Sequence, residues 1–233
     1  MKIGLISDIH GNLEALTAAM QSLEKRRVER LYCLGDVVGY GANPSECLEL
    51  VREKAEVLLL GNHDAAVAGI ESLEHFNPYA REAALWTQRI LSLEQRRFLA
   101  GLPYEEIRGE MHLVHSAPAH PQEWDYIFSA LDAYCQFVSV KARDCFVGHS
   151  HVPGEYSEGS ASGAKDRTGR RIINIGSVGQ PRDGDPRLCF VIYDEASREV
   201  QFMREDYDIE EASRKILEAG LPSFLAQRLF AGR

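Results

Sequence analysis

Three short apolar segments in the first 60 residues of the chain each end on polar residues next to glycine. Residues 3–6 run into Asp8 and His10, residues 31–34 into Gly35 and Asp36, and residues 57–60 into Gly61-Asn62-His63-Asp64. Packing alone seldom ends a buried strand on a carboxylate or an imidazole. The pattern therefore predicts strands that carry functional residues at their carboxyl ends.

Two helices are predicted between these strands. Apolar residues at helical spacing follow Asn12, which is placed to cap the first helix, and Asn43-Pro44 opens the second. A β-α-β-α-β order indicates parallel strands, and right-handed crossovers bring their carboxyl ends to one edge of a sheet. Ligands bind at that edge in such sheets. The residues expected to meet there are Asp8, His10, Asp36, Asn62 and His63.

The remainder of the chain mixes helices and strands. Residues 65–101 and 129–142 read as helical, and residues 209–232 as helical with a break at 220–222. The strands expected here are 112–115, 145–147, 171–175 and a hairpin of 188–193 with 200–204. Residues 157–171 are rich in Ser, Gly, Lys and Arg, which predicts an exposed loop. Because no linker or repeat interrupts the chain, we predict a single domain over residues 1–233.

Composition excludes several classes of protein. The net charge of −9 argues against a long nucleic acid as a partner, because counterion release needs a basic surface. The first apolar run is too short for a secretion signal, and no uncharged run could span a membrane. The five cysteines are scattered without a C-x-x-C pair, which favours reduced thiols and a cytoplasmic location. A homo-oligomer is left open.

Histidines also follow two of the later strands, His115 after residues 112–114 and His149 with His151 after residues 145–147. Asp8 and His10 are two residues apart, so in an extended segment both side chains point to one side. Imidazole and carboxylate groups at one place favour a metal ion. Dinucleotide, P-loop and serine hydrolase motifs are all missing from the sequence.

Collected in order, Asp8-x-His10, Gly35-Asp36, Gly61-Asn62-His63-Asp64, His115 and Gly148-His149-x-His151 resemble the signature of the calcineurin-like metallophosphoesterases. The resemblance spans residues 8–151. It implies an α/β fold, a four-layer α/β/β/α sandwich of two mixed sheets flanked by helices. It also implies two metal ions with the following ligands. Asp8, His10 and His151 would hold one ion, Asn62, His115 and His149 the other, and Asp36 would bridge them.

The donor set indicates the kind of ion and the kind of ligand. Only two of the seven ligands are charged, so two divalent ions would keep roughly +2 and attract an anion. The imidazoles favour Mn, Fe, Zn or Ni over Mg or Ca. Such a pair can supply a bridging hydroxide that attacks a phosphate ester. His63, beside a ligand, is the candidate general acid, and Asp64 is expected to orient its ring.

The resemblance is to the small bacterial and archaeal branch, which favours a small phosphate ester, a phosphodiester or a nucleotide, as substrate. The alternatives are a phosphomonoesterase, a protein phosphatase, and an inactive interaction module of the same fold. Because His63 and all seven ligand positions are filled, the sequence favours an enzyme.

A few further residues are open to two interpretations. A lone histidine is more often structural than catalytic, and this applies to His75, His112 and His120. Aromatic residues in the loop 116–128 could line a cleft or pack the loop against the core, and an arginine at 182 or 187 could meet a phosphate or an acidic partner. The aromatic residues are Trp124, Tyr126 and Phe128.

Overall fold

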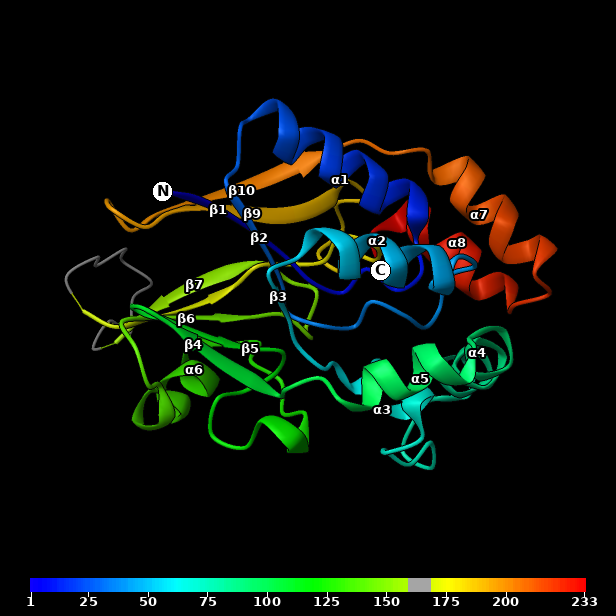
Figure 1. The fold of residues 1–233 in the computed structure, drawn as a ribbon, viewed down its shortest axis with the longest axis horizontal. Helices are drawn as coiled ribbons and strands as arrows, with labels where there is room; N and C mark the ends of the chain where they lie inside the picture. The colour runs from blue at the N-terminus through cyan, green and yellow to red at the C-terminus, as the bar shows by residue number, and fades with distance from the viewer. Residues whose placement is uncertain (159–168) are drawn as a thin grey trace.

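The computed structural model describes residues 1–158 and 169–233 of the chain (Figure 1). The loop predicted over residues 157–171 lies for the most part outside these ranges. Two five-stranded sheets form the centre of the molecule. The first contains, in spatial order, β10 (Glu199–Glu205), β9 (Leu188–Asp194), β1 (Lys2–Ile6), β2 (Arg30–Cys33) and β3 (Val57–Leu58).

The first sheet has the predicted winding. Strands β1, β2 and β3 are parallel neighbours, with Ile3 opposite Arg30 and Tyr32 opposite Val57. Strands β9 and β10 form the predicted antiparallel hairpin, and β9 also pairs antiparallel with β1. The sheet is therefore mixed, and the carboxyl ends of its three parallel strands meet at one edge.

The second sheet is also mixed. Its order is β4 (Glu105–Arg108), β5 (Met111–Val114), β6 (Asp144–Val147), β8 (Arg171–Asn174) and β7 (Gly154–Ser157). The three central strands are parallel, and the edge strands β4 and β7 are antiparallel to them. Neither edge strand is predicted from the sequence, because EEIR and GEYS are short, half-exposed and lack an apolar run.

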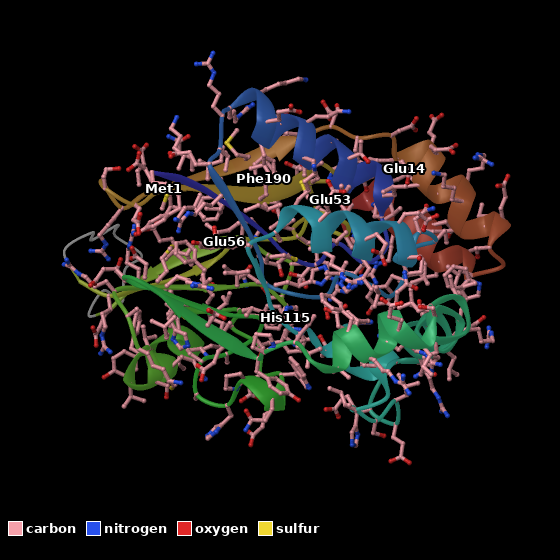
Figure 2. The ribbon with its side chains drawn as sticks, in the orientation of Figure 1. Met1, Glu14, Glu53, Glu56, His115 and Phe190 are labelled. Carbon is pink, nitrogen blue, oxygen red and sulfur yellow. The ribbon has the colours of Figure 1, made fainter. Side chains whose placement is uncertain are left out.

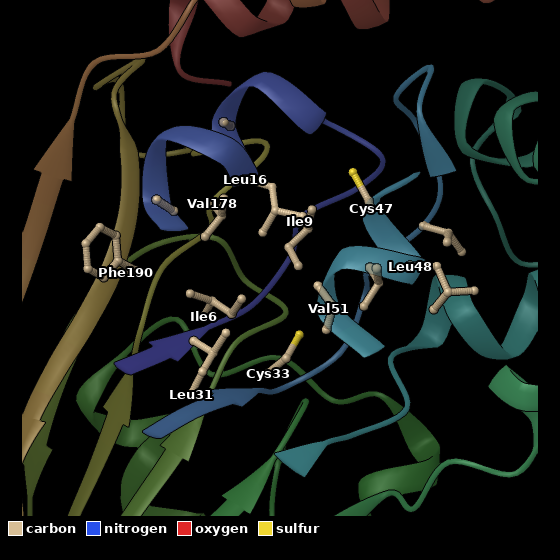
Figure 3. Close-up of a cluster of buried hydrophobic side chains, with 14 of the residues drawn as sticks. Ile6, Ile9, Leu16, Leu31, Cys33, Cys47, Leu48, Val51, Val178 and Phe190 are labelled. Carbon is tan, nitrogen blue, oxygen red and sulfur yellow. The ribbon is translucent and has the colours of Figure 1, made fainter. Parts of the chain in front are cut away.

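Alternating side chains divide the core into layers. Ile3 and Leu5 of β1 pack between the two sheets, whereas Ile6 points outward to α1 (Leu13–Lys25) and α2 (Pro44–Lys54), as Figure 3 shows. Both helices lie over the outer face of the first sheet (Figure 1). On the other side, α6 (Ala130–Gln136) lies over the second sheet. The four-layer α/β/β/α sandwich is thereby confirmed.

Two helical predictions need correction. The helix predicted over 129–142 ends at Gln136 and continues as a 3₁₀ turn, η2 (Phe137–Ser139), which places Phe137 and Val140 in the same apolar cluster. Residues 69–77, within the region 65–101 that the sequence predicts as helical, are instead irregular after Gly69 takes a left-handed conformation. The helices of this region are α3 (Asn62–Ala68), α4 (Pro78–Ile90) and α5 (Leu93–Ala100), and the last two open at Asn77-Pro78 and at a Ser92–Gln95 capping box.

The C-terminal segment forms two helices, α7 (Ile209–Glu218) and α8 (Ser223–Ala231), with the predicted break between them. They share an apolar cluster with Tyr40, which follows β2, and with Ala80 and Ala83 of α4. Figure 1 shows α7 and α8 on the same side of the molecule as α4. The end of the chain is thus packed against the loop that follows the second strand.

A buried ion-pair network joins the second sheet to the β9–β10 hairpin. The Asp144 carboxylate accepts hydrogen bonds from Arg171 Nε at 2.7 Å, Arg198 Nη2 at 2.6 Å and Tyr193 Oη at 2.6 Å. Asp144 and Arg171 are both fully buried. Burial would raise the pKa of Asp144, but the hydrogen bonds from Arg198 and Arg171 lower it.

Within the two described ranges, no helix is long and apolar enough to cross a bilayer.

Candidate metal centre

The predicted site residues of the first sheet follow its parallel strands directly. Asp8 and His10 come after β1, Asp36 after β2, and Asn62 and His63 begin α3 after β3. The loops that carry them are joined by main-chain hydrogen bonds, because the amides of Ile9 and His10 both donate to the Asp36 carbonyl at 2.9 and 3.0 Å. This pairing holds the first two loops in a fixed relation to each other.

The second sheet contributes the remaining three histidines. His115 follows β5, and His149 and His151 follow β6. Figure 2 labels His115, which lies near the middle of the molecule. All three are nearly or fully buried. The edges of both sheets thus contribute residues to one site, as the sequence predicts.

The first cluster contains Asp8, His10 and His151, whose ligating atoms lie within 4.8 Å of one another. The Asp8 Oδ1 atom is 3.2 Å from His151 Nε2 and 3.9 Å from His10 Nε2. The two Nε2 atoms themselves approach within 3.2 Å. These are the three residues that the resemblance assigns to one metal ion.

Backbone carbonyls fix the tautomers of these rings. His10 Nδ1 lies 3.1 Å from the Val38 carbonyl and His151 Nδ1 lies 2.6 Å from the Gln180 carbonyl. Because a carbonyl only accepts, each Nδ1 carries the proton, and in a neutral ring each Nε2 keeps a lone pair. Burial lowers the pKa of both imidazoles, so both rings are neutral. Two lone pairs and a carboxylate oxygen therefore face one point, which a cation fits.

The second cluster contains Asp36, His115 and His149. His115 Nδ1 donates to the Leu34 carbonyl at 2.9 Å and leaves Nε2 facing Asp36 Oδ2 at 3.5 Å. His149 Nε2 lies 2.9 Å from the Trp124 carbonyl, so its Nδ1 is the nitrogen free to bind a metal. Such outer hydrogen bonds orient metal-binding histidines in known sites.

Asp36 lies between the clusters. Its Oδ2 atom is 3.6 Å from His10 Nε2 and 3.5 Å from His115 Nε2. One carboxylate oxygen thus faces a histidine of each cluster, which is the position that a bridging ligand needs. Burial lowers the pKa of His115, but the Asp36 charge outweighs this and raises it to about 9. The negative charge of the Asp36 carboxylate therefore favours a positive charge at this place, and a divalent ion would supply it.

Several buried polar atoms at this place have no hydrogen-bond partner in the described residues. They are Asp8 Oδ1, Asn62 Oδ1, His115 Nε2 and His63 Nδ1. Buried polar atoms are rarely left unpaired, because desolvation without a partner is costly. The first three are atoms of predicted metal ligands. The residues present therefore fit two divalent ions.

Glycines let the loops approach this closely. A Cβ atom at Gly148 would lie 2.6 Å from Asp8 Oδ2, and one at Gly61 would lie 2.1 Å from Asp36 Oδ1. The turn at residues 176–179 also supports the site, since Ser177 Oγ and the Gly179 amide both donate to the Asp8 carbonyl at 2.8 and 2.9 Å. Close backbone approach explains why these positions are glycine.

Five of the seven predicted ligands have a left-handed backbone conformation. Their φ angles lie between 51° and 64°. For a residue other than glycine this conformation costs on the order of 1 kcal/mol or more, and such strain gathers at functional sites. Asp and His tolerate it better than most residues. The five residues are Asp8, His10, Asp36, His149 and His151.

His63 faces the same cluster from the first turn of α3, which begins three residues before the helical region predicted from residue 65. Its ring lies 4.5 Å from the Tyr40 ring and 5.0 Å from the Phe76 ring, between centroids. It forms a further group of ligating atoms with His10 and Asp36. Burial, opposed by Asp36 and reinforced by the Arg182 charge, lowers the pKa of His63 to about 4. The ring is therefore neutral near pH 7.

Asp64 does not hydrogen-bond to His63, which differs from our expectation. Its carboxylate accepts from the backbone amides of Val37, Val38 and Gly61 at 3.1 to 3.3 Å, and His63 Nδ1 has no partner in the described residues. The reason is helical geometry, because successive side chains of a helix diverge by about 100°. Asp64 instead joins the start of α3 to the loop that carries Asp36.

A cleft opens beside His63 and His149. Its walls come from residues 71–77, which precede α4, and from residues 122–126 of the loop after β5. Trp124 and Tyr126 line it, and the Tyr126 ring stacks on His149 at 4.0 Å between centroids. Phe128 is 60% exposed and stacks on Tyr126. The interpretation of this loop as a cleft wall is therefore confirmed for two of its three aromatic residues.

The three isolated histidines have different environments. His75 lines the cleft but is exposed. His112 is buried and 2.8 Å from Glu105 Oε2, which is a structural contact. His120 is exposed at the start of a 3₁₀ turn, η1 (Pro121–Glu123). Of the three, only His75 lines the cleft.

Some residues of the site are not recognisable in the sequence. Tyr40 packs on His10 and His63, and its only signal is the pair of glycines that flank it. Phe76 sits in a segment predicted as helix. The carbonyls of Leu34, Val38 and Gln180, which orient the histidines, carry no side-chain signal at all.

A sandwich of two sheets with a histidine and aspartate cluster across their edges defines a metal-dependent phosphoesterase. The Calcineurin-like phosphoesterase superfamily domain matches residues 1–198, and the chain belongs to this superfamily. It is accordingly a metal-dependent hydrolase, and the family uses divalent metal ions and acts on small phosphate esters.

Relatives match over the whole chain. An uncharacterized protein of Methanocaldococcus jannaschii is 42% identical over 99% of this chain and 98% of its own length. The crystal structure of a metallophosphoesterase from Sphaerobacter thermophilus has a TM-score of 0.90 at 43% identity, covering 100% of this chain and 99% of that one. A hypothetical protein from Pyrococcus horikoshii OT3 shares the fold, with a TM-score of 0.86 at 20% identity over 100% and 98%.

Proposed function

We propose that the chain is a two-metal enzyme that hydrolyses a small phosphate ester. A phosphodiester or a nucleotide is the substrate that we favour. The observation that carries this is the pair of adjoining clusters with Asp36 between them, since Asp36 Oδ2 lies 3.6 Å from His10 Nε2 and 3.5 Å from His115 Nε2. Asp8, His10 and His151 would hold one ion, and Asn62, His115 and His149 the other. When bound, the two ions would lower the pKa of a water molecule and neutralise the phosphoryl oxygens.

The protein groups would position the substrate and move a proton. The cleft lined by Trp124 and Tyr126 leads to His63 and His149 and is open to solvent. In our proposal His63 is the general acid that protonates the leaving oxygen. A neutral His63 ring would gain its proton when the phosphate anion arrives, because a nearby negative charge raises the pKa of an imidazole.

Asp64 supports this role indirectly. Its carboxylate receives three backbone amides and so fixes the first turn of α3 relative to the Asp36 loop. The Asp36 Oδ1 atom also accepts from the His63 amide at 2.8 Å. The backbone of His63 is therefore tied to the bridging carboxylate, and we propose that this contact positions the acid relative to the metal ions.

A substrate panel tests the proposal. Protein loaded with Mn is assayed with bis-p-nitrophenyl phosphate, p-nitrophenyl phosphate and dinucleoside polyphosphates, before and after removal of the metal by a chelator. We expect turnover of the diester and loss of all turnover on chelation. Turnover of the monoester alone would support the phosphomonoesterase alternative. Absence of metal-dependent turnover on every substrate would refute the proposed function.

Further predictions stay open to measurement. Mn, Fe, Zn and Ni all suit a site with four imidazoles, and elemental analysis of the purified protein would identify the ion. The free cysteines are compatible with a reducing compartment, and a cytoplasmic location remains a prediction. The oligomeric state is left open, and light scattering would measure it.

A further inference from the structure

Two arginines beside the metal centre have no acidic side chain to pair with among the described residues. Arg182 follows the 176–179 turn, and Arg228 lies in α8. Each guanidinium carbon lies over the Tyr40 ring, at 5.9 Å for Arg182 and 5.8 Å for Arg228. The same ring lies 4.8 Å from the His10 ring, between centroids. The arginine pair therefore adjoins the metal centre without belonging to its clusters.

The bonds of Arg182 leave its charge uncompensated. One nitrogen, Nη2, donates to the Gln180 side-chain oxygen at 2.8 Å. The Nε atom is buried and has no partner in the part of the chain that the structure describes. Neighbouring carboxylates pair elsewhere, since Asp183 binds Arg204 and Asp185 binds Arg187. Of the two arginines considered from the sequence, Arg187 is thus neutralised and Arg182 is not.

Arg228 likewise has no acidic side chain as a partner among the described residues. Its Nε donates to the main-chain oxygen of Arg233, the last residue of the sequence, and its guanidinium also lies 5.3 Å from the Phe224 ring centre. Burial, with the charge of Arg182, lowers the pKa of Arg228 to about 10. Two like charges near each other, with no acidic side chain paired to either among the described residues, are unfavourable unless an anion binds both. The superfamily match ends at residue 198, so Arg228 comes from a segment outside it.

The amount of positive charge indicates the kind of ligand. Two divalent ions with two carboxylates already keep roughly +2, which suffices for one phosphoryl group. The arginine pair adds two positive charges beside that site. Guanidinium groups bind phosphate through paired N–H donors. Excess charge next to the scissile position suits a substrate with more than one phosphate.

We propose that Arg182 and Arg228, which both approach the Tyr40 ring, form a subsite for a second anionic group of the substrate, a phosphate distinct from the scissile one. This rests on the proposed function. The subsite would select substrates with linked phosphates over simple diesters. Arg228 would make the C-terminal helices part of substrate recognition.

Binding of two phosphonates tests the subsite. Methylenediphosphonate carries two linked phosphorus groups that water does not cleave, and methylphosphonate carries one. Their affinities are measured by calorimetry with Mn-loaded wild type and with Arg182→Gln, Arg228→Gln and Arg187→Gln, and metal content is determined afterwards. The titration is repeated with metal-free protein, because a diphosphonate can bind metal ions. Thermal unfolding of each variant checks that it is folded.

We expect wild type to bind the diphosphonate at least about 10-fold more tightly than the monophosphonate. Arg182→Gln and Arg228→Gln should each reduce this preference by about 10-fold, the usual value of a charged hydrogen bond, and Arg187→Gln should keep it. Equal losses for both phosphonates would place the arginines on the scissile phosphoryl and overturn the subsite. Absence of any preference in wild type would also overturn it. The titrations measure binding and need no turnover. A failure of the proposed hydrolysis in the substrate panel would therefore be distinguished from a failure of the subsite.

Discussion

Replacement of His63 by Asn separates proton transfer from metal binding. The structure allows both roles, since His63 lies near Asp36 and His10 and also lines the cleft. If His63 is the general acid, His63→Asn should lower kcat by about 10²–10⁴, or about 2.7–5.5 kcal/mol in the activation free energy. Metal content should not change, because the two proposed ligand sets do not include His63.

The loss should depend on the leaving group. An ester that expels p-nitrophenolate, a stable anion, needs little protonation and should be affected least, whereas a nucleoside or alkyl ester should be affected most. The assay is kcat for both esters with elemental analysis of the same samples. His75→Asn is the matched control, because His75 lines the same cleft outside the clusters. Equal losses on both esters, or loss of metal, would refute the acid role.

Three further predictions concern the bridge, a glycine and the buried ion pair. Asp36→Asn should lower activity at least about 100-fold and release metal from both sites, as measured by elemental analysis. Gly148→Ala should destabilise the fold by about 1–3 kcal/mol and weaken metal binding, because its Cβ would lie 2.6 Å from Asp8 Oδ2; unfolding in urea and metal content check this. Asp144→Asn should cost about 3–5 kcal/mol at pH 7, because it leaves Arg171 buried without its main partner. The pKa of Asp144 is lowered on folding, so the difference in unfolding free energy between wild type and Asp144→Asn should be constant above about pH 4. It should shrink as the pH falls further, and a constant difference down to acid pH would contradict the role of the Asp144 charge.

The sequence predicts most of the fold because hydrophobic periodicity marks its central strands. Strands β1, β2, β5 and β6 are apolar runs that the sheets bury on both faces. The edge strands β4 and β7 are missed because they bury little and carry charged or polar residues. The end of α6 is misplaced for a related reason, since tertiary packing of Phe137 and not local propensity decides where the helix stops.

The gathering of the cluster is predictable because it follows from topology. Parallel strands with right-handed crossovers bring Asp8, Asp36 and Asn62 to one edge whatever the loops contain. The expected bond from Asp64 to His63 fails because the sequence does not show that α3 begins at Asn62. Arg228 could not be predicted at all, because its place at the site depends on how the C-terminal helices pack against Tyr40.

The strained backbone of the ligands shows why glycines lie among them. Asp8, His10 and Asp36 have left-handed conformations that a non-glycine residue adopts only when its surroundings enforce it. The enforcement is visible in the hydrogen bonds between the loops, where Asp8 donates to Gly35 and His10 to Asp36 through their amides. Glycines at the contacts let these backbones approach closely enough to form such bonds. Strain at the ligands and close packing between their loops are therefore parts of one arrangement, in which the side chains converge before any ion binds. A site organised in this way loses little entropy on binding metal, and substitutions at its glycines should weaken it without removing a ligand.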